Sequence, residues 1–206
     1  MYVGFKNAVS PLRVTIRLLE AISDNPKYNK FMPLLRQLKE KVLIELFEKC
    51  ELIAQHTQKH CLGRKGNSTE TEVFFNKVVG DFYRYMAEFT PKQEAKQLGM
   101  CKEKAQKAYT KAMEVAQNGF GFKKALDVCN STRLSVSLHF ANFTFELLGQ
   151  PQEACNICET ALNEAKVREE EISDEQYKEY NHLAELMREN ITYWKSEVKP
   201  GAPAQP

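Results

Sequence analysis

Residues 72–89 read EVFFNKVVGDFYRYMAEF, and their apolar side chains recur at every third or fourth position. The positions that repeat in this way are Phe74, Val78, Phe82, Tyr85 and Phe89. This spacing places them on one face of an α-helix. A second set at helical spacing is charged and consists of Lys77, Asp81, Arg84 and Glu88. The segment therefore predicts an amphipathic helix, with an apolar face for packing and a charged stripe opposite it.

The same apolar spacing extends over most of the chain, and strand signals are absent from the sequence. We expect about seven helices, near residues 4–24, 29–61, 70–89, 91–117, 123–148, 151–169 and 174–196. Short connections between long amphipathic helices favour antiparallel neighbours stacked in a layer. The sequence thus predicts an all-α single domain over residues 1–197, followed by a Pro-rich tail at residues 198–206.

Three candidate capping boxes mark helix starts. In such a box, a hydroxyl and a Glu or Gln three residues later satisfy free N–H groups of the first turn. The three lie at Thr69–Glu72, Thr90–Gln93 and Ser173–Gln176. Pro11 falls inside the first predicted helix, where a proline removes a hydrogen bond and costs about 3 kcal/mol. We therefore expect that helix to begin late or to kink at Pro11.

The composition is that of a folded domain. Hydrophobic residues make up 43% and charged residues 27% of the 206 residues, which is ordinary for globular proteins. No run approaches the roughly 18 apolar residues of a membrane span, and the N-terminus lacks a signal-peptide pattern. A cytoplasmic or nuclear location is therefore expected. The formal net charge of +2 is too near zero to favour nucleic acid or an anionic membrane as a partner.

Cations gather on the first predicted helix. Lys6, Arg13 and Arg17 follow one another at intervals that place them on one face of that helix, without an intervening acid. A solvated basic face is the simpler interpretation. Arg84 and Tyr85 favour another, because guanidinium groups bind phosphate oxygens in bidentate pairs and a phenol adds one more donor. The sequence thus predicts a phosphate site, in which nearby acids hold the arginines extended.

The sequence offers little support for an enzyme. It contains no glycine-rich phosphate loop, no nucleophile elbow and no supported pair of carboxylates, and we expect no cofactor. Cys155 and Cys158 have the spacing of a redox or zinc motif, but they lie within a helical pattern. Core packing is the simpler explanation for both. We therefore expect reduced cysteines and no metal site.

Four blocks of the sequence follow the pattern of a known protein family. They are Gly80–Glu88, Ser173–Lys178, Leu186–Trp194 and Phe5–Val9. In these blocks the chain resembles the 14-3-3 family of phosphopeptide-binding adaptors, and in the first of them the match is nearly residue for residue. The resemblance covers almost the whole chain. It implies a curved layer of helices with a concave, amphipathic groove that holds phosphorylated segments of client proteins.

The resemblance also implies roles for individual residues. The phosphate-binding positions are occupied by Lys6, Arg13, Arg84 and Tyr85. The positions beside the main chain of the ligand are occupied by Asn190, His139 and Trp194. The remaining groove positions are occupied by Lys77 on the basic side and by Leu138, Leu183 and Leu186 on the apolar wall.

The chain departs from the family pattern at several groove positions. His139 stands where the family has a second asparagine that holds the ligand main chain, so His139 is either a ligand-binding group or a structural histidine. Asn142, His182 and Tyr193 replace apolar residues, and Ser135 replaces a glycine. The family also begins with two helices that precede the first one here and supply half of its dimer contact. A weaker family-type dimer, or none, is therefore expected.

Two functions from different classes follow from these observations. The first is an adaptor that binds phosphoserine or phosphothreonine segments of client proteins and regulates signalling, without making or breaking bonds. The second is a helical scaffold that binds partners through its apolar faces and has lost phosphate dependence. The four intact phosphate positions favour the first.

Overall fold

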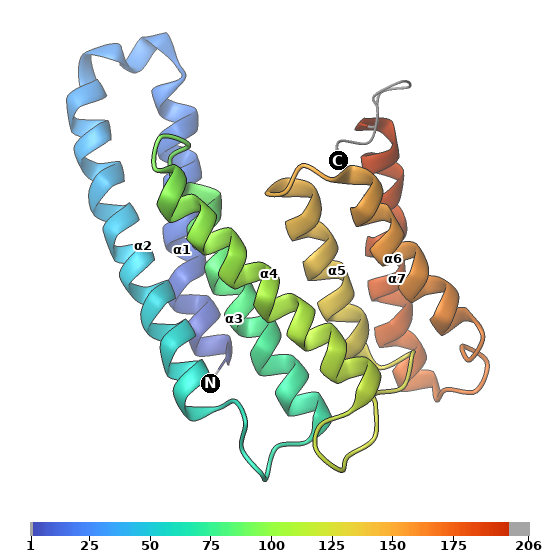
Figure 1. Ribbon diagram of the computed structural model, residues 1–206. Helices are drawn as coiled ribbons and strands as arrows, with labels where there is room; N and C mark the ends of the chain where they lie inside the picture. The colour runs from blue at the N-terminus through green and yellow to red at the C-terminus, as the bar shows by residue number, and fades with distance from the viewer. Residues whose placement is uncertain (1, 198–206) are drawn as a thin grey trace.

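The computed structural model describes residues 2–197 and contains seven α-helices within that range (Figure 1). They are α1 (Tyr2–Ser23), α2 (Met32–His60), α3 (Thr69–Phe89), α4 (Ala95–Asn118), α5 (Ser131–Glu146), α6 (Pro151–Lys166) and α7 (Asp174–Glu197). A short 3-10 helix, η1 (Pro26–Phe31), joins α1 to α2. The predicted all-α fold is confirmed, and the predicted tail at residues 198–206 lies outside the described residues. None of the helices described is long and apolar enough to cross a bilayer.

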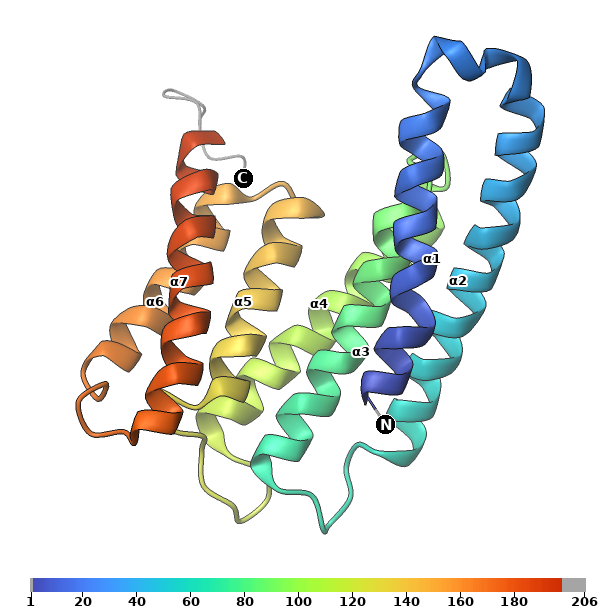
Figure 2. The ribbon, with the colours of Figure 1, turned by 180° about the vertical axis from the view of Figure 1, so that it is seen from behind.

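The helices form two layers. Each helix packs against the next one along the chain, and α5 packs in addition against α3 and α7. Consecutive helices run in opposite directions (Figure 1). Figure 2 shows α1, α3, α5 and α7 on the side nearer the viewer, with α2, α4 and α6 behind them. The four odd-numbered helices therefore run in the same direction and share one side of the molecule, which we call the odd-numbered face.

The apolar stripe of residues 72–89 is a packing face in the structure. Phe82 and Tyr83 of α3 belong to the larger of two cores, together with Tyr109 of α4 and Phe143 of α5. The smaller core lies between α5, α6 and α7 and includes Trp194. The helices α3 and α5 also pack against each other, and α5 contributes residues to both cores. The position of α5 beside α3 is therefore held by both cores.

Two of the three candidate capping boxes are wrong. Ser68 caps α3 in place of Thr69, and its Oγ accepts a hydrogen bond from the backbone N–H of Thr71 at 3.0 Å. Thr90 ends α3 and does not begin α4, and its hydroxyl donates to the carbonyl oxygen of Met86 in the last turn of α3 at 2.8 Å. The N-cap residue of α4 is Glu94, which forms no side-chain cap hydrogen bond. The helix α4 thus begins only at residue 95.

The third candidate capping box is present in the structure, whereas the late start expected for the first helix is not. Ser173 and Gln176 form the predicted capping box, since the backbone N–H of each donates to the side chain of the other, at 3.2 and 3.3 Å. The helix α1 runs from Tyr2 through Pro11 to Ser23, so the expectation of a late start is wrong. Packing of α1 against α2 therefore maintains the helix despite the lost hydrogen bond.

The fifth helix begins at Ser131 and not near residue 123. Gly119 follows α4 with a φ of 87°, and a Cβ at this position would lie 2.0 Å from the carbonyl oxygen of Lys123. Only glycine therefore fits this turn. The side chain of Asn130 then accepts hydrogen bonds from backbone N–H groups of the first turn of α5, including that of Thr132 at 3.0 Å. This cap fixes the start of the helix.

Candidate functional site

The ring of Tyr85, on α3, contacts two arginines. The guanidinium carbon of Arg13, on α1, is 3.8 Å from the centroid of the Tyr85 ring, and that of Arg84, on α3, is 5.0 Å from it. Both distances are within the range of a cation–π contact. The structure thus brings together three of the four residues that were predicted to bind phosphate.

Glu88, one turn after Tyr85, holds two arginines of α1. Arg13 Nη2 lies 2.7 Å from one carboxylate oxygen of Glu88, and Arg17 Nη2 lies 2.5 Å from the other. The side chain of Arg13 is 18% exposed and that of Arg17 is 60% exposed, so Arg13 is the more enclosed of the two. Lys6 is exposed and has no ion-pair partner within residues 2–197. Among the four phosphate candidates, Lys6 is thus the one without an ion pair or a cation–π contact within the described residues.

Arg84 is enclosed at the contact of α3 and α5. Its side chain is 11% exposed, and its Nη1 lies 3.1 Å from a carboxylate oxygen of Glu146, which is 52% exposed. Within residues 2–197, its Nε is one of two buried side-chain polar atoms without a hydrogen-bond partner. Burial alone would lower the pKa of Arg84, but neighbouring phenol and carboxylate groups outweigh it and raise that pKa. Arg84 is therefore a charged group with an unused donor.

Asp81, one turn before Arg84, is 1% exposed and collects three donors. Its Oδ2 lies 3.0 Å from Nζ of Lys77, and its Oδ1 lies 2.7 Å from the hydroxyl of Tyr109 and 2.6 Å from Nδ1 of His139. Burial alone would raise the pKa of Asp81, but the nearby imidazole, ammonium and guanidinium groups hold it well below its usual value. A buried carboxylate thus links α3 to α4 and α5.

His139 of α5 takes part in this buried cluster and also has an accessible edge, since its side chain is 26% exposed. Burial lowers the pKa of His139, and Lys77 and Arg84 act in the same direction, although Asp81 opposes them. The imidazole is therefore neutral at pH 7. The structure supports the structural interpretation through the bond to Asp81, while a contact of His139 with a ligand stays a prediction.

On α7, Asn190 reaches across to α5. Its Nδ2 donates a 3.0 Å hydrogen bond to Oδ1 of Asn142. Trp194, one turn later, is 3% exposed and stacks on Phe145 of α5 at a centroid distance of 5.4 Å. Trp194 is therefore a packing residue that supports this part of α7. Asn142, a departure from the family pattern, is the internal partner of Asn190.

The other predicted groove residues differ in their exposure. Leu138 is 6% exposed, Leu183 is partly buried and Leu186 is 36% exposed. Lys77 is 4% exposed, and its Nζ is bonded to Asp81. A ligand could therefore contact Leu186 directly, whereas contact with Lys77 would require that side chain to leave the buried carboxylate.

Cys155 and Cys158 lie in the smaller core. Both are free thiols that are at most 1% exposed. Burial raises the pKa of Cys155 and raises that of Cys158 to about 12. Both thiols are therefore protonated at neutral pH, while a metal ligand or a nucleophile must be a thiolate. The packing interpretation fits both residues.

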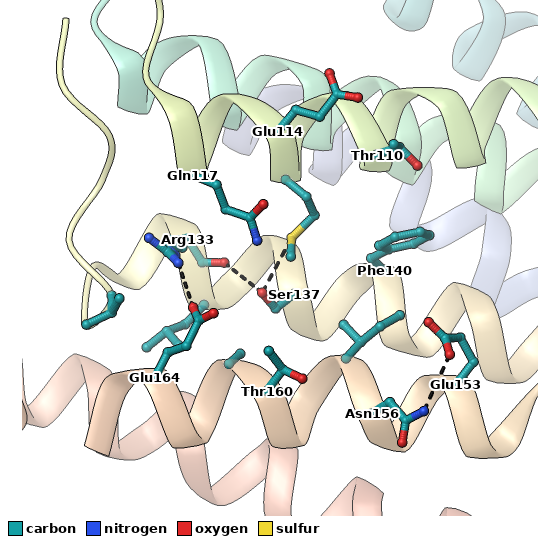
Figure 3. Close-up of a pocket in the computed structure, with 15 residues that line it drawn as sticks. Thr110, Glu114, Gln117, Arg133, Ser137, Phe140, Glu153, Asn156, Thr160 and Glu164 are labelled. Carbon is teal, nitrogen blue, oxygen red and sulfur yellow. Dashed lines mark hydrogen bonds and ion pairs between the residues drawn. The ribbon is translucent and has the colours of Figure 1, made fainter. Parts of the chain in front are cut away.

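The cavity that Figure 3 shows lies between α4, α5 and α6 and has a volume of about 320 Å³. Phe140 and Leu134 contribute to its apolar lining, and the Arg133–Glu164 ion pair at 2.6 Å joins α5 to α6 beside it. None of the residues predicted to bind a ligand lines this cavity. The candidate site is instead a row of polar contacts that links the four odd-numbered helices. These contacts are Arg13–Glu88, Arg84–Glu146, His139–Asp81 and Asn190–Asn142.

Two residues that belong to this row or contact it, Glu146 and Tyr109, were not predicted from the sequence. Glu146 follows His139 by about two helical turns, so the spacing places both on the same side of α5 and could have indicated that Glu146 belongs to the site. Tyr109 offered no such signal, because only the packing of α4 against α3 brings its hydroxyl to Asp81.

Comparison with known proteins identifies the family. The 14-3-3 protein family model matches residues 1–195. The 14-3-3 protein beta/alpha of Gallus gallus is 31% identical over 196 residues, which cover 95% of this chain and 76% of that protein. The 14-3-3-like protein GF14 epsilon of Arabidopsis thaliana is 30% identical over 199 residues, 95% of this chain and 74% of that protein. The 14-3-3 protein I of Plasmodium falciparum is 30% identical over 202 residues, 96% and 72% respectively.

The family match spans all seven helices, including those that carry the arginine–tyrosine cluster and the Asn190 side chain. The chain therefore belongs to the 14-3-3 family of non-enzymatic adaptor proteins.

Proposed function

We propose that this protein binds segments of client proteins that carry phosphoserine or phosphothreonine, and that it regulates signalling by holding them. The observation that carries the proposal is the contact of both Arg13 and Arg84 with the ring of Tyr85. Two guanidinium groups and a phenol at the contact of two helices can surround a phosphate group from several directions. Such charge-assisted hydrogen bonds are about twice as strong as neutral ones.

The local charge supports this assignment. Three arginines at this cluster, Arg13, Arg17 and Arg84, share only two carboxylates, Glu88 and Glu146. An incoming phosphate dianion thus meets a net positive charge. Glu88 keeps Arg13 in place before the ligand arrives, which reduces the entropy that binding must remove.

Neighbouring side chains can hold the rest of the client segment. His139 of α5 lies near Arg84, and Asn190 of α7 contacts α5 through Asn142. The imidazole and the amide both suit the main chain of an extended peptide. Leu186 of α7, at 36% exposure, offers an apolar contact. The peptide would then lie across α3, α5 and α7.

One observation favours the alternative of a phosphate-independent scaffold. Arg13 and Arg84 already have carboxylate partners. If these pairs are permanent, the helices could bind partners without phosphate. The two functions differ in one measurable property, which is the effect of the phosphate group on affinity.

The test is calorimetric titration with a library-selected phosphoserine peptide and with its unphosphorylated copy. We expect binding of the phosphorylated form only, and a loss of tenfold or more in affinity for Arg84→Ala, as about 2 kcal/mol or more for a truncated charged pair implies. Arg133→Ala is the matched control, because Arg133 is also a mostly enclosed arginine of an ion pair but lies beside α6. Equal affinity for both peptides would support the scaffold instead.

A further inference from the structure

The hydrogen bonds around Asp81 fix the proton positions of its neighbours. A carboxylate without a proton only accepts hydrogen bonds. Lys77 and Tyr109 satisfy it as donors, from an ammonium and a hydroxyl. His139 must then also donate through Nδ1, which lies 2.6 Å from Oδ1. The proton of a neutral His139 therefore sits on Nδ1.

The other ring nitrogen of His139 is left as an acceptor. A neutral imidazole with its proton on Nδ1 carries a lone pair on Nε2. Within residues 2–197 the buried unpartnered side-chain polar atoms are Thr57 Oγ1 and Arg84 Nε alone. Nε2 of His139 has no hydrogen-bond partner in that range either. If it were buried, it would be a third unpartnered atom of this kind, so it must be exposed to solvent. The accessible edge of His139 is thus a hydrogen-bond acceptor next to the arginine cluster.

We infer that Asp81 is a positioning residue that locks the tautomer of His139, and that the Nε2 atom of His139 selects ligand segments offering a hydrogen-bond donor there, such as a peptide N–H. This inference rests on the proposed function, because it assumes that a peptide lies over α5. A side-chain amide at this position would offer both a donor and an acceptor. The imidazole accepts only, and a proline in the ligand at that point would leave it unpaired.

The charged groups facing His139 support this arrangement. They are Asp81, Lys77 and Arg84, all of α3. The neutral hydroxyl of Tyr109, from α4, bonds to Asp81. The two cations disfavour a second proton on the ring, while the carboxylate orients the first. The bond between α3 and α5 therefore does two things, since it holds the helices together and sets the polarity of the group shown to the ligand.

The first experiment measures the tautomer without any ligand. The ring nitrogens of His139 are observed by NMR in protein with ¹⁵N-labelled histidine at pH 7.5, and the signals are assigned with His139→Gln. We expect a protonated Nδ1 and an unprotonated Nε2. Asp81→Asn should release this preference. Tyr109→Phe removes another hydrogen bond to the same Oδ1 but retains the carboxylate, so the preference of His139 for a proton on Nδ1 should persist.

A proton on Nε2 in the wild type would overturn the inference, whatever the peptide experiments show. If Asp81→Asn fails to fold by circular dichroism, the wild-type and Tyr109→Phe spectra still decide. A Tyr109→Phe protein with a changed tautomer would show that the phenol, and not the carboxylate, is responsible.

The second experiment locates the donor on the ligand. Each amide of one phosphoserine peptide that binds the wild type is replaced in turn by an ester, which removes the N–H. One replacement should weaken binding to the wild type by about three- to tenfold, the effect of one hydrogen bond, and should weaken binding to His139→Ala much less. Equal effects in both proteins at every position would overturn the ligand half of the inference.

These outcomes separate the inference from the proposed function. A peptide that binds equally well without its phosphate contradicts the proposed function, yet the ester series still tests His139. A phosphate-dependent peptide without any ester effect at His139 contradicts the inference alone. Absence of binding by every phosphoserine peptide in the library would overturn both.

Discussion

Gly80 of α3 and the ring of Tyr109 of α4 are in direct contact, and a Cβ at Gly80 would lie 2.8 Å from two carbon atoms of that ring. The missing side chain lets Tyr109 approach α3 closely enough for its hydroxyl to reach Asp81 at 2.7 Å. The glycine of the GDFYRY segment is thus a condition for the buried polar cluster beneath the candidate site.

We expect Gly80→Ala to destabilise the fold by about 1–2 kcal/mol. Alanine gains up to about 1 kcal/mol of helix propensity over glycine, but forcing a methyl group into a packed core costs about 1–3 kcal/mol, and here the displaced ring loses its bond to Asp81. Urea denaturation measures the difference. The control is Gly99→Ala on α4, where nothing lies within 4 Å of the added Cβ, so stability should rise. A stabilised Gly80→Ala would contradict the contact.

The ion pair between Arg84 and Glu146 predicts a gain in affinity. In Glu146→Gln, the carboxylate that competes with phosphate for Arg84 is gone, so phosphopeptide binding should tighten by about two- to fivefold, in keeping with about 1 kcal/mol or less for a partly exposed pair. Calorimetry measures the affinity. Folding stability should fall slightly, because a mostly enclosed guanidinium loses its partner.

Glu164→Gln is the matched control for this change. Arg133 is 13% exposed and Glu164 is 41% exposed, compared with 11% for Arg84 and 52% for Glu146. The control removes a similar pair beside the cavity of Figure 3, so stability should fall without a change in affinity. An affinity that falls in Glu146→Gln would mean that Glu146 orients Arg84 for the ligand.

Periodicity was enough to predict the all-α fold and the packing face of α3, because each helix buries one apolar stripe. It misplaced the start of α4, since a Thr-Pro pair fits a helix start as well as a helix end, and in the structure Thr90 ends α3 with its hydroxyl bonded to the carbonyl oxygen of Met86. It also misplaced the start of α5, because the cap that sets this start is Asn130.

The candidate site was predictable where charges repeat along one helix and not where helices meet. Spacing grouped Arg13 with Lys6 and Arg17 on the first helix. The family resemblance joined Arg13 to Arg84 and Tyr85. The bond of His139 to Asp81 joins residues 58 positions apart, and no local pattern contains that information. For the same reason, the role of Asn142 as the partner of Asn190 emerges only from the packing of α5 against α7.

The lowered pKa of His139 predicts a pH dependence of folding stability. An unfolded histidine binds its proton near about pH 6.5, whereas burial keeps the folded His139 neutral to lower pH. Below about pH 6.5 the unfolded chain therefore binds more protons than the folded one, and stability falls as the pH falls towards the folded pKa. Above that window, His139 contributes no slope.

Urea denaturation of the wild type and of His139→Asn between pH 8 and pH 5 tests this prediction. The two free energies of unfolding should differ by a constant amount above about pH 7, and below about pH 6.5 the wild type should lose stability faster. His182→Asn is the control, because His182 is an exposed histidine of α7. Parallel curves for wild type and His139→Asn would show that the folded pKa is not lowered.

The hydrogen bond from Asn190 to Asn142 predicts opposite changes in stability and affinity. One of the two N–H groups of its amide is already used within the protein, so Asn190 offers one donor fewer to a peptide main chain while this bond persists. In Asn142→Val the internal acceptor is absent. Folding stability should fall by about 1 kcal/mol, the usual net value of one hydrogen bond, while both N–H groups of Asn190 become free to donate to the ligand.

Phosphopeptide affinity of Asn142→Val should therefore rise by a few fold, and Asn190→Ala should cancel the gain, because the effect passes through Asn190 alone. Calorimetry on the two single variants and the double variant measures this coupling. Thr192→Val is a control on the exposed side of α7, where the hydroxyl bonds only to its own helix, and it should leave affinity unchanged. A loss of affinity in Asn142→Val would mean that Asn142 orients Asn190 towards the ligand and does not compete with it.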